Sequence, residues 1–273
     1  MDYLLIGHIT QDITPEGSRP GGPVAYSGLT AQALGLQVGI VTSWAEENTP
    51  EAFKHLSIAN HHCDHSTTFE NLNTPSGRVQ KIHHLAPEID FFHVPESWRH
   101  TRIVHFAPVA QEIPPNIVRN FSHSDIYLSL QGWLRKWDQQ GNVSRSEWPE
   151  YGYILQQVNA AVLSEEDVES DLEIIYRMAA SAPVLAVTKG ADGADIYAEG
   201  NIYSIPAPAV DEIDSTGAGD IFAAVFFSQL SHFGDPLKAG TLAVQIASDS
   251  VTRSGLESTP TEDILYQIRS EVQ

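Results

Sequence analysis

Short apolar runs that alternate with helix-forming stretches constrain the fold of this chain more than any other feature. Continuous Val, Ile and Leu runs separated by helices favour a parallel sheet that is buried on both faces. The predicted fold class is therefore α/β, with a doubly wound, mostly parallel sheet and helices on both faces. The predicted strands are 3–9, 37–44, 102–109, 125–132, 159–164 and 183–190, the helices 21–35, 165–181, 220–234 and 237–251, and a hairpin 194–207.

Composition limits the partners of the chain. Its 273 residues are 42% hydrophobic, enough for a single domain over residues 1–273. A net charge of −20 repels nucleic acid and anionic membranes, so a small-molecule partner is expected. Cys63 is the only cysteine, the N-terminus reads as a first strand, and no apolar run approaches the roughly 18 residues of a membrane span. These features predict a cytoplasmic protein.

The segment Asp214-Ser-Thr-Gly-Ala-Gly-Asp220 precedes an apolar helix. The N–H groups of Gly217, Ala218 and Gly219 would lie in the first helical turn, where they have no helical partner and can bind an anion. Asp220 has two readings, a carboxylate stabilised by the helix dipole and a general base beside a bound phosphate. The glycines before it favour the second reading.

Two other glycine-rich phosphate motifs do not match this segment. A Walker loop requires G-x-x-x-x-G-K followed by Ser or Thr, and the chain contains no such string. A dinucleotide fingerprint requires a third glycine at position 222, which is Phe222, and a strand directly before Gly217. Another nucleotide-dependent reaction on a doubly wound sheet is therefore disfavoured.

The same segment resembles the C-terminal signature of the ribokinase-like (PfkB) carbohydrate kinase family. The resemblance extends over most of the chain and is closest to short-lid, inositol kinase-like members. Asp12 in GHITQD resembles the substrate-binding aspartate of the first strand, and GGPVAYSGLTAQALG (21–35) resembles the N-terminal signature. VTKGADGADIY (187–197) and VTRSGLEST (251–259) resemble the segments beside the nucleotide.

The resemblance implies ATP-dependent phosphoryl transfer to a hydroxyl of a small polyol, which would be a sugar, an inositol or a nucleoside. Asp220 would accept the hydroxyl proton, and the N–H groups of Gly217, Ala218 and Gly219 would hold the charge on the transferred phosphoryl group. Asp12 would orient the acceptor, with Gly21 and Gly22 letting the backbone approach it. Thr188, Gly190 and Gly193 would line the nucleotide, and Lys189 would either neutralise phosphates or be an exposed lysine.

The resemblance also implies Mg²⁺ and a potassium ion. The family's N-x-x-E motif, which organises magnesium through water, corresponds to Ser164-Glu-Glu-Asp167. Asp167 is shorter than glutamate, so metal binding would be weaker or rearranged. Backbone groups near Asp214 and Thr216 would hold potassium.

Departures from the family pattern affect the acceptor side. Tyr26 replaces an asparagine that often touches the substrate, which leaves the acceptor open. Eight residues separate Asp12 from Gly21, so the lid is expected to be short or absent, supplied at most by a hairpin over 64–85. A missing lid is compatible with a monomer, and a homodimer is the alternative. A non-catalytic relative that binds a sugar or nucleotide is the rival function.

Other polar residues are weighed against structural roles. Gln131 and Arg135 follow a predicted strand and would reach the acceptor or a phosphate on it, unless Arg135 only pairs with surface acids. The histidines of HHCDH (61–65), with His83, His84 and His93, are predicted to be structural or at the surface rather than metal ligands. His105 is predicted to be a hydrogen-bonded core residue. The predicted core stripe of the last apolar helix is Phe222, Val225, Phe226 and Leu230.

Overall fold

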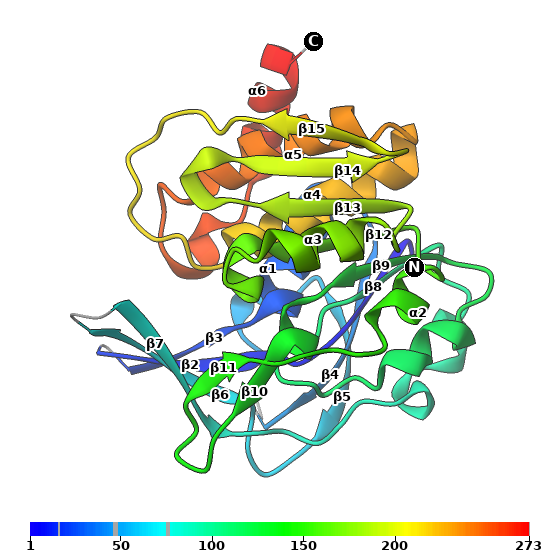
Figure 1. Cartoon of the computed structure of the whole chain (residues 1–273). Helices are drawn as coiled ribbons and strands as arrows, with labels where there is room; N and C mark the ends of the chain where they lie inside the picture. The colour runs from blue at the N-terminus through cyan, green and yellow to red at the C-terminus, as the bar shows by residue number, and fades with distance from the viewer. Residues whose placement is uncertain (16, 46–48, 75–76, 273) are drawn as a thin grey trace.

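We describe a computed structural model of the chain, which covers residues 1–15, 17–45, 49–74 and 77–272. In these ranges one nine-stranded sheet forms the centre, in the order β15-β14-β13-β12-β9-β8-β1-β4-β5 (Figure 1). Its strands are β1 (Tyr3–Ile6), β4 (Val38–Trp44), β5 (Ser57–His62), β8 (Ile103–Phe106), β9 (Asp125–Ser129), β12 (Ala160–Ser164), β13 (Val184–Thr188), β14 (Ala194–Ala198) and β15 (Asn201–Ile205).

The fold-class prediction is confirmed. Seven neighbouring strands of this sheet pair in parallel, in the order β13-β12-β9-β8-β1-β4-β5, whereas β14 and β15 continue the sheet as an antiparallel hairpin at one edge. Every residue of β1, β4 and β8 is buried, as expected for a sheet covered on both faces. The strand β5 was not predicted, because it is a polar strand at the other edge with mostly exposed residues.

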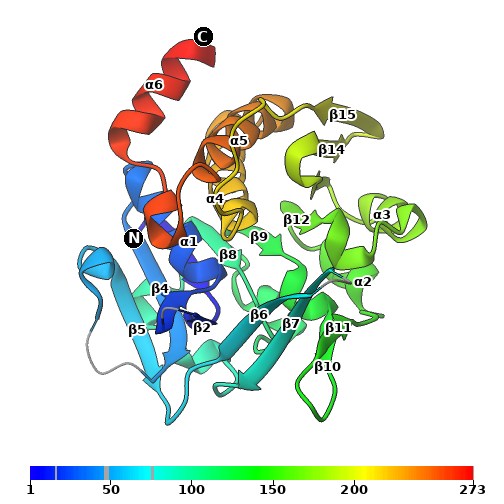
Figure 2. The same cartoon turned by 90° about the vertical axis from the view of Figure 1, so that its left-hand side faces the viewer.

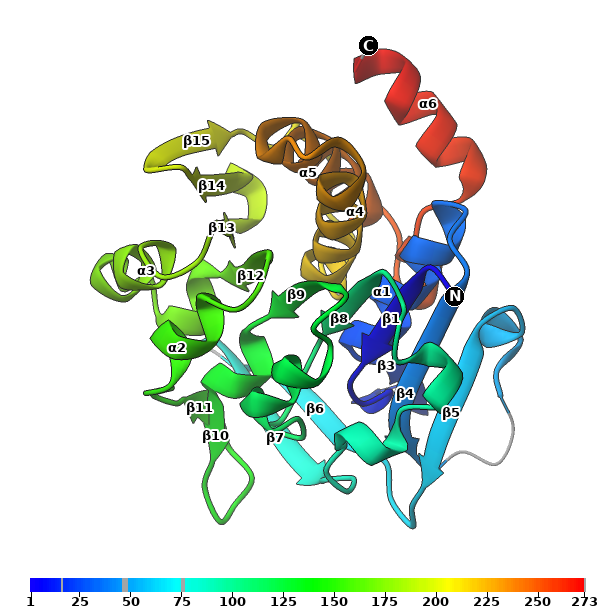
Figure 3. The ribbon, with the colours of Figure 1, turned by 90° about the vertical axis from the view of Figure 1, so that its right-hand side faces the viewer.

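Two apolar clusters cover the two faces of the sheet (Figures 2 and 3). The first includes α1 (Pro23–Ala33), α4 (Ala218–Phe233) and α5 (Pro236–Ser250), and Phe222, Val225 and Phe226 lie in it as predicted. The second includes α2 (Tyr151–Leu155), α3 (Leu172–Ala179) and the 3-10 helix η4 (Pro115–Asn120). The helix α6 (Glu262–Val272) packs on α5 near the C-terminus and was not predicted.

The single helix predicted over 165–181 is wrong. A 3-10 helix, η6 (Glu165–Val168), comes first, and α3 begins only at Leu172. Between them Glu169 and Ser170 have φ of 55° and 56°, in the left-handed region that ends a helix. The side chain of Asp171 then accepts hydrogen bonds from the N–H groups of Glu173 and Ile174 and starts α3.

A second, four-stranded sheet lies beside the large sheet, on the side to which β13 points (Figure 1). We call it the small sheet; its order is β3 (Gly17–Gly21), β2 (Thr10–Thr14), β6 (Thr68–Thr74) and β7 (Gly77–His84). The hairpin predicted at 64–85 is confirmed, with positions 75–76 outside the described residues. Residues 10–21 add the strands β2 and β3 to that hairpin.

A short two-stranded ribbon, β10 (Arg135–Trp137) and β11 (Val143–Arg145), completes the described strands. No helix among the described residues has the length and apolarity to cross a membrane.

Candidate active site

The predicted site residues gather where the parallel strands of the large sheet end. Gln131 follows β9, Ser164 ends β12 and Thr188 ends β13, with Ser164 and Thr188 in register as neighbours. Asp12 lies on β2 of the small sheet. The carboxyl ends of parallel strands are where open α/β sheets bind ligands.

The start of α4 has the conformation that an anion site requires. Gly217 precedes the helix with φ of 83°, and a Cβ there would overlap the ring of Tyr26. The N–H of Ala218 donates to the carbonyl of Ser215 at 3.2 Å, so that donor is already engaged by the chain. Within the described ranges, no hydrogen bond uses the N–H of Gly217 or Gly219, and Gly219 is exposed. Two of the three predicted donors therefore have no hydrogen-bond partner among the described residues.

Asp220 lies in the first turn of α4 and is half-buried. Burial raises its pKa to about 7; the nearby Arg135 lowers it, and Asp167 and Asp12 raise it further. The Ser27 hydroxyl on α1 donates to the Asp220 carbonyl at 2.9 Å, which fixes the start of α4 against α1. A carboxyl group with a pKa near neutrality is suited to accept a proton from a hydroxyl.

Arg135 is the cation that faces these carboxylates. Its Nη1 donates to the Val109 carbonyl at 3.2 Å, and its Cζ lies 5.6 Å from the centre of the Phe69 ring on the small sheet. Gln131 donates to Oδ1 of Asp167 at 3.3 Å. Both residues therefore line the group of carboxylates, and the alternative of a surface arginine does not hold for Arg135.

Asp167 lies in η6, directly after β12, and its charge acts on Asp220. Desolvation raises the pKa of its carboxyl group, against the opposing effects of Arg135 and of hydrogen bonds from Ser164 and Gln131. Its Oδ2 accepts the N–H of Ser164 at 2.9 Å, while the Ser164 hydroxyl accepts the N–H of Glu166 at 3.3 Å. The Ser164-to-Asp167 segment is thus a capping box at the start of η6.

Asp12 occupies the space left by a glycine. A Cβ at Gly21 would overlap the Asp12 carboxylate, and the hydroxyl of Thr10 donates to Oδ1 of Asp12 at 3.3 Å. Gly22 has φ of 87° and lies against the carbonyl of His8. The packing of the chain itself requires these two glycines, in addition to any role that they have toward a ligand.

Glu112 fixes the backbone beneath this site and was missed by sequence reasoning. The carboxylate is 3% exposed and accepts the N–H groups of His8 at 3.1 Å, Val109 at 3.0 Å and Ala110 at 2.7 Å. It therefore joins the segments that follow β1 and β8. Because Val109 also binds Arg135 through its carbonyl, Glu112 holds the anchor of that guanidinium. An acid shortly after an apolar strand was the only signal available.

The predicted nucleotide residues surround the end of β13. The hydroxyl of Thr188 lies 3.5 Å from the Leu163 carbonyl, and Gly190 begins the short 3-10 helix η7 (Gly190–Asp192), which Gly193 follows. Lys189 forms an ion pair with Asp195 at 2.9 Å, and both side chains are mostly buried. Lys189 is thus neither exposed nor free to bind phosphate without losing this pair.

Asp214 is surrounded by donors. Oδ1 accepts the N–H of Thr216 at 3.0 Å; Oδ2 accepts the N–H of Gly255 and the Ser254 hydroxyl at 3.3 Å each. Arg19 Nη2 lies 3.4 Å from the same Oδ2. Desolvation opposes ionisation, but the bonds from Thr216 and Gly255 and the charge of Arg19 lower the pKa of Asp214 overall. These donors engage the Asp214 carboxylate itself; the potassium ligands expected from the sequence were backbone groups near Asp214 and Thr216.

His105 has the structural role that was predicted. His105 is fully buried, hydrogen-bonds with the Tyr3 hydroxyl at 3.1 Å and with the Ser129 hydroxyl at 2.8 Å, and has a pKa lowered to about 3 by burial. Among the described residues, no group of three or more His, Cys, Asp or Glu side chains could hold a metal ion, and HHCDH lies mostly exposed on and after β5.

The sequence resembles known kinases in its C-terminal part. Residues 159–263 match the model of the pfkB family carbohydrate kinases. An ATP-dependent ribose-1-phosphate kinase from Halopiger xanaduensis is 30% identical over 125 residues, 45% of this chain and 42% of that protein. A fructokinase from Escherichia coli is 27% identical over 156 residues, 50% of this chain and 48% of that protein. The chain therefore spans less than half the length of these curated relatives.

The fold resembles solved kinases over nearly the whole chain. A pyrophosphate-dependent kinase in the ribokinase family, complexed with a pyrophosphate analog and myo-inositol, superposes with a TM-score of 0.80. The match covers 94% of this chain and 98% of that one at 18% identity, which shows the fold alone. The resemblance to the PfkB carbohydrate kinases is thus confirmed by sequence over residues 159–263 and by a ribokinase-like fold over the chain as a whole.

Proposed function

We propose that the chain transfers a phosphoryl group from ATP to a hydroxyl of a small polyol, which is a sugar, an inositol or a nucleoside. The observation that carries this proposal is the start of α4. There the Asp220 carboxyl group, with its pKa raised to about 7, lies next to the N–H groups of Gly217 and Gly219. This arrangement supports a proton acceptor beside an anion site, the combination that phosphoryl transfer to an alcohol requires.

The reaction that these residues support needs no covalent intermediate. Asp220 accepts the proton of the acceptor hydroxyl while the hydroxyl oxygen forms a bond to the γ-phosphorus and the bond to ADP breaks. The free N–H groups at the start of α4 stabilise the charge on the transferred group. Asp12, across the site on the small sheet, binds hydroxyls of the acceptor and so aligns the reacting one with Asp220.

The Asp167 carboxylate also suits a hydrated magnesium ion. Each oxygen of Asp167 accepts one hydrogen bond, from Ser164 or from Gln131, and so keeps a lone pair for a metal-bound water. Mg²⁺ commonly retains several waters in kinase sites and neutralises charge on the phosphates. Asp167 would hold the ion through water, while Thr188, Gly190 and Gly193 border the nucleotide.

The capping box favours a second candidate, a relative that binds a sugar or nucleotide without transfer. Asp167 is one methylene shorter than glutamate, and both of its oxygens already accept hydrogen bonds within the chain. Lys189 is held by Asp195 rather than directed at a phosphate. These contacts leave fewer groups for the phosphates of ATP than the family pattern implies.

A coupled assay for ADP release tests the two candidates directly. ATP and Mg²⁺ are supplied with a panel of pentoses, hexoses, inositols, nucleosides and their monophosphates, and Asp220→Asn serves as the blank. Parallel reactions replace ATP with pyrophosphate and detect the phosphorylated product. Turnover with ATP that the variant lacks supports the proposal and identifies the acceptor class.

Silence with both donors, combined with ATP or acceptor binding by calorimetry, would instead support the binding relative. Turnover with pyrophosphate but not with ATP would contradict the proposed donor. That result would still support Asp220 as the proton acceptor, but it would contradict nucleotide binding by the residues at the end of β13.

A further inference from the structure

Arg19 lies at the junction between the small sheet and the start of α4. It is on β3, directly opposite Asp12 on β2 in the antiparallel register, so the two side chains extend from the same face of the small sheet. Its Nη2 reaches Oδ2 of Asp214 at 3.4 Å. One guanidinium therefore connects the strand pair that carries Asp12 to the segment that leads into Gly217.

The guanidinium of Arg19 lies beside the Asp214 carboxylate. It lies against Gly255, since a Cβ there would come within 3.1 Å of Nη1 of Arg19. The N–H groups of Thr216 and Gly255 point at the same carboxylate. A further cation beside Asp214 would meet one fixed positive charge and several N–H and O–H donors, and Oδ2 already faces three of these groups.

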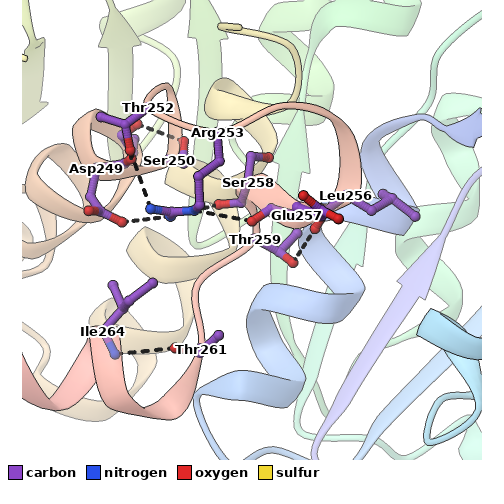
Figure 4. A network of polar contacts seen from close by, with 11 residues as sticks. Asp249, Ser250, Thr252, Arg253, Leu256, Glu257, Ser258, Thr259, Thr261 and Ile264 are labelled. Atoms are coloured by element: carbon purple, nitrogen blue, oxygen red, sulfur yellow. Dashed lines mark hydrogen bonds and ion pairs between the residues drawn. The ribbon is translucent and has the colours of Figure 1, made fainter. Parts of the chain in front are cut away.

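A second arginine, Arg253, shapes the loop that follows α5 (Figure 4). Arg253 donates to the carbonyls of Glu257 at 3.1 Å and Ser258 at 3.2 Å and pairs with Asp249 at 2.6 Å. Its Nη1 also donates to the Thr252 hydroxyl at 3.3 Å. Carbonyl oxygens are the usual ligands of hard cations in loops, and here two of them are bound to a guanidinium.

We propose that Arg19 supplies, from within the chain, the positive charge that a potassium ion would supply beside Asp214, and that it clamps the small sheet over the start of α4. The positive charge of Arg19 beside Asp214 thus disfavours the potassium ion that the sequence led us to expect there. Arg19 acts as a positioning residue, because it sets Asp12 relative to Asp220. Its effect on turnover rests on the proposed function, whereas its effect on cation dependence of stability does not.

Thermal unfolding provides a test that needs no acceptor. The midpoint is measured in potassium chloride and in tetramethylammonium chloride at equal ionic strength, because the larger ion cannot enter a space the size of a guanidinium nitrogen. We expect the unmodified chain to unfold at the same temperature in both salts. Arg19→Ala should unfold at a lower temperature in tetramethylammonium and recover part of the loss in potassium, which can enter the vacated space.

Turnover is then compared in the same two salts with the acceptor found in the panel. The unmodified chain should differ by less than about twofold, whereas Arg19→Ala should lose about tenfold or more in tetramethylammonium and be partly rescued by potassium. Arg19→Lys, which keeps the charge, should retain most of the activity. Arg177→Ala on α3 is the matched control, because it removes an exposed arginine whose ion pair in the described part of the chain is with Glu173, four residues away.

A midpoint or a rate of the unmodified chain that rises strongly with potassium would overturn the proposal, even if Arg19→Ala fails to fold. An Arg19→Ala variant that behaves like Arg177→Ala in both salts would overturn it as well. Failure of the proposed kinase function would give a different result. Turnover would then be absent in every salt, whereas the unfolding temperature of Arg19→Ala, unlike that of the unmodified chain, would still depend on potassium.

Discussion

Asp214 and Asp220 are six positions apart in the sequence and have opposite environments. Asp214 accepts hydrogen bonds from both sides of the site and pairs with Arg19, so its pKa is lowered. Asp220 loses solvent without gaining comparable donors, and its pKa is raised to about 7. A single loop-helix junction can thus keep one carboxylate, Asp214, ionised in a structural role and leave another, Asp220, with a pKa suited to proton transfer.

The largest expected effect comes from removing the proton acceptor. Asp220→Asn should lower kcat by about 10²- to 10⁴-fold, because an amide cannot take the proton of the acceptor hydroxyl. ATP affinity, measured by calorimetry, should change little. Asp214→Asn is the matched control on the same segment and should retain far more turnover. Near-full turnover by Asp220→Asn would remove the distinction between the two carboxylates.

The dependence of kcat on pH should also distinguish Asp220 from Asp214. Asp220 must be ionised to act as a base, so kcat should reach half its maximum near pH 7, the pKa of this group. It should fall about tenfold for each pH unit below that. Asp214 stays ionised over this range and should not contribute. A rate independent of pH between about 5 and 8 would show that proton transfer to Asp220 does not limit turnover.

Asp12 lies on the small sheet and is near Asp220. Its removal should weaken acceptor binding more than it slows the chemical step. Asp12→Ala should raise the KM for the acceptor by about 10- to 100-fold, since two hydrogen bonds to acceptor hydroxyls are lost. The KM for ATP should be nearly unchanged. Initial rates over a grid of both substrates check this. An unchanged acceptor KM would exclude Asp12 from the acceptor site.

The smallest effects concern stability, and they should have opposite signs. Asp214→Asn should destabilise the protein by about 1–3 kcal/mol at pH 7, because an amide replaces a carboxylate that accepts several bonds. The lowered pKa means that this contribution of Asp214 is present above its unfolded value and is lost as pH falls. Asp220→Asn should instead stabilise the protein at pH 8 and have little effect below pH 4.

The second sign follows from the raised pKa of Asp220. The folded state favours the protonated form of the Asp220 carboxyl group. The contribution of this group to the free energy of unfolding is therefore greatest below the pKa of the unfolded chain, and it is lost as pH rises through about 7. Urea titrations at two pH values measure both variants. Asp220→Asn and Asp214→Asn variants that shift stability in the same direction at pH 8 would contradict the comparison.

The sequence predicted the large sheet well, because its strands are continuous apolar runs that only a covered parallel sheet can bury. It also placed Asp12, Asp167, Asp220 and Arg135 at one edge, since strand ends and the start of α4 meet there. The contacts among them were not predictable. They depend on the path of the small sheet, whose strands β2 and β3 are short, polar and separated by a turn.

Arg19 shows what sequence reasoning missed and where the signal was. Residues 10–21 were not read as a hairpin, so the register that places Arg19 opposite Asp12 was not considered. Its partner Asp214 is 195 positions away, and a pair so distant cannot be deduced from local pattern. The engagement of Lys189 by Asp195 was missed for a related reason, because it depends on the antiparallel pairing of β13 with β14.

The contact between Tyr26 and Gly217 has a consequence for altering this protein by design. The ring of Tyr26 is 1% exposed and lies where a side chain at Gly217 would be, so α1 and the start of α4 pack through one buried contact. A smaller residue at position 26 would open a cavity next to Gly217 and remove the support of the helix start on which the proposed phosphate site depends. Changes at position 26 should therefore alter stability and rate together, and variants there should carry compensating changes in α4.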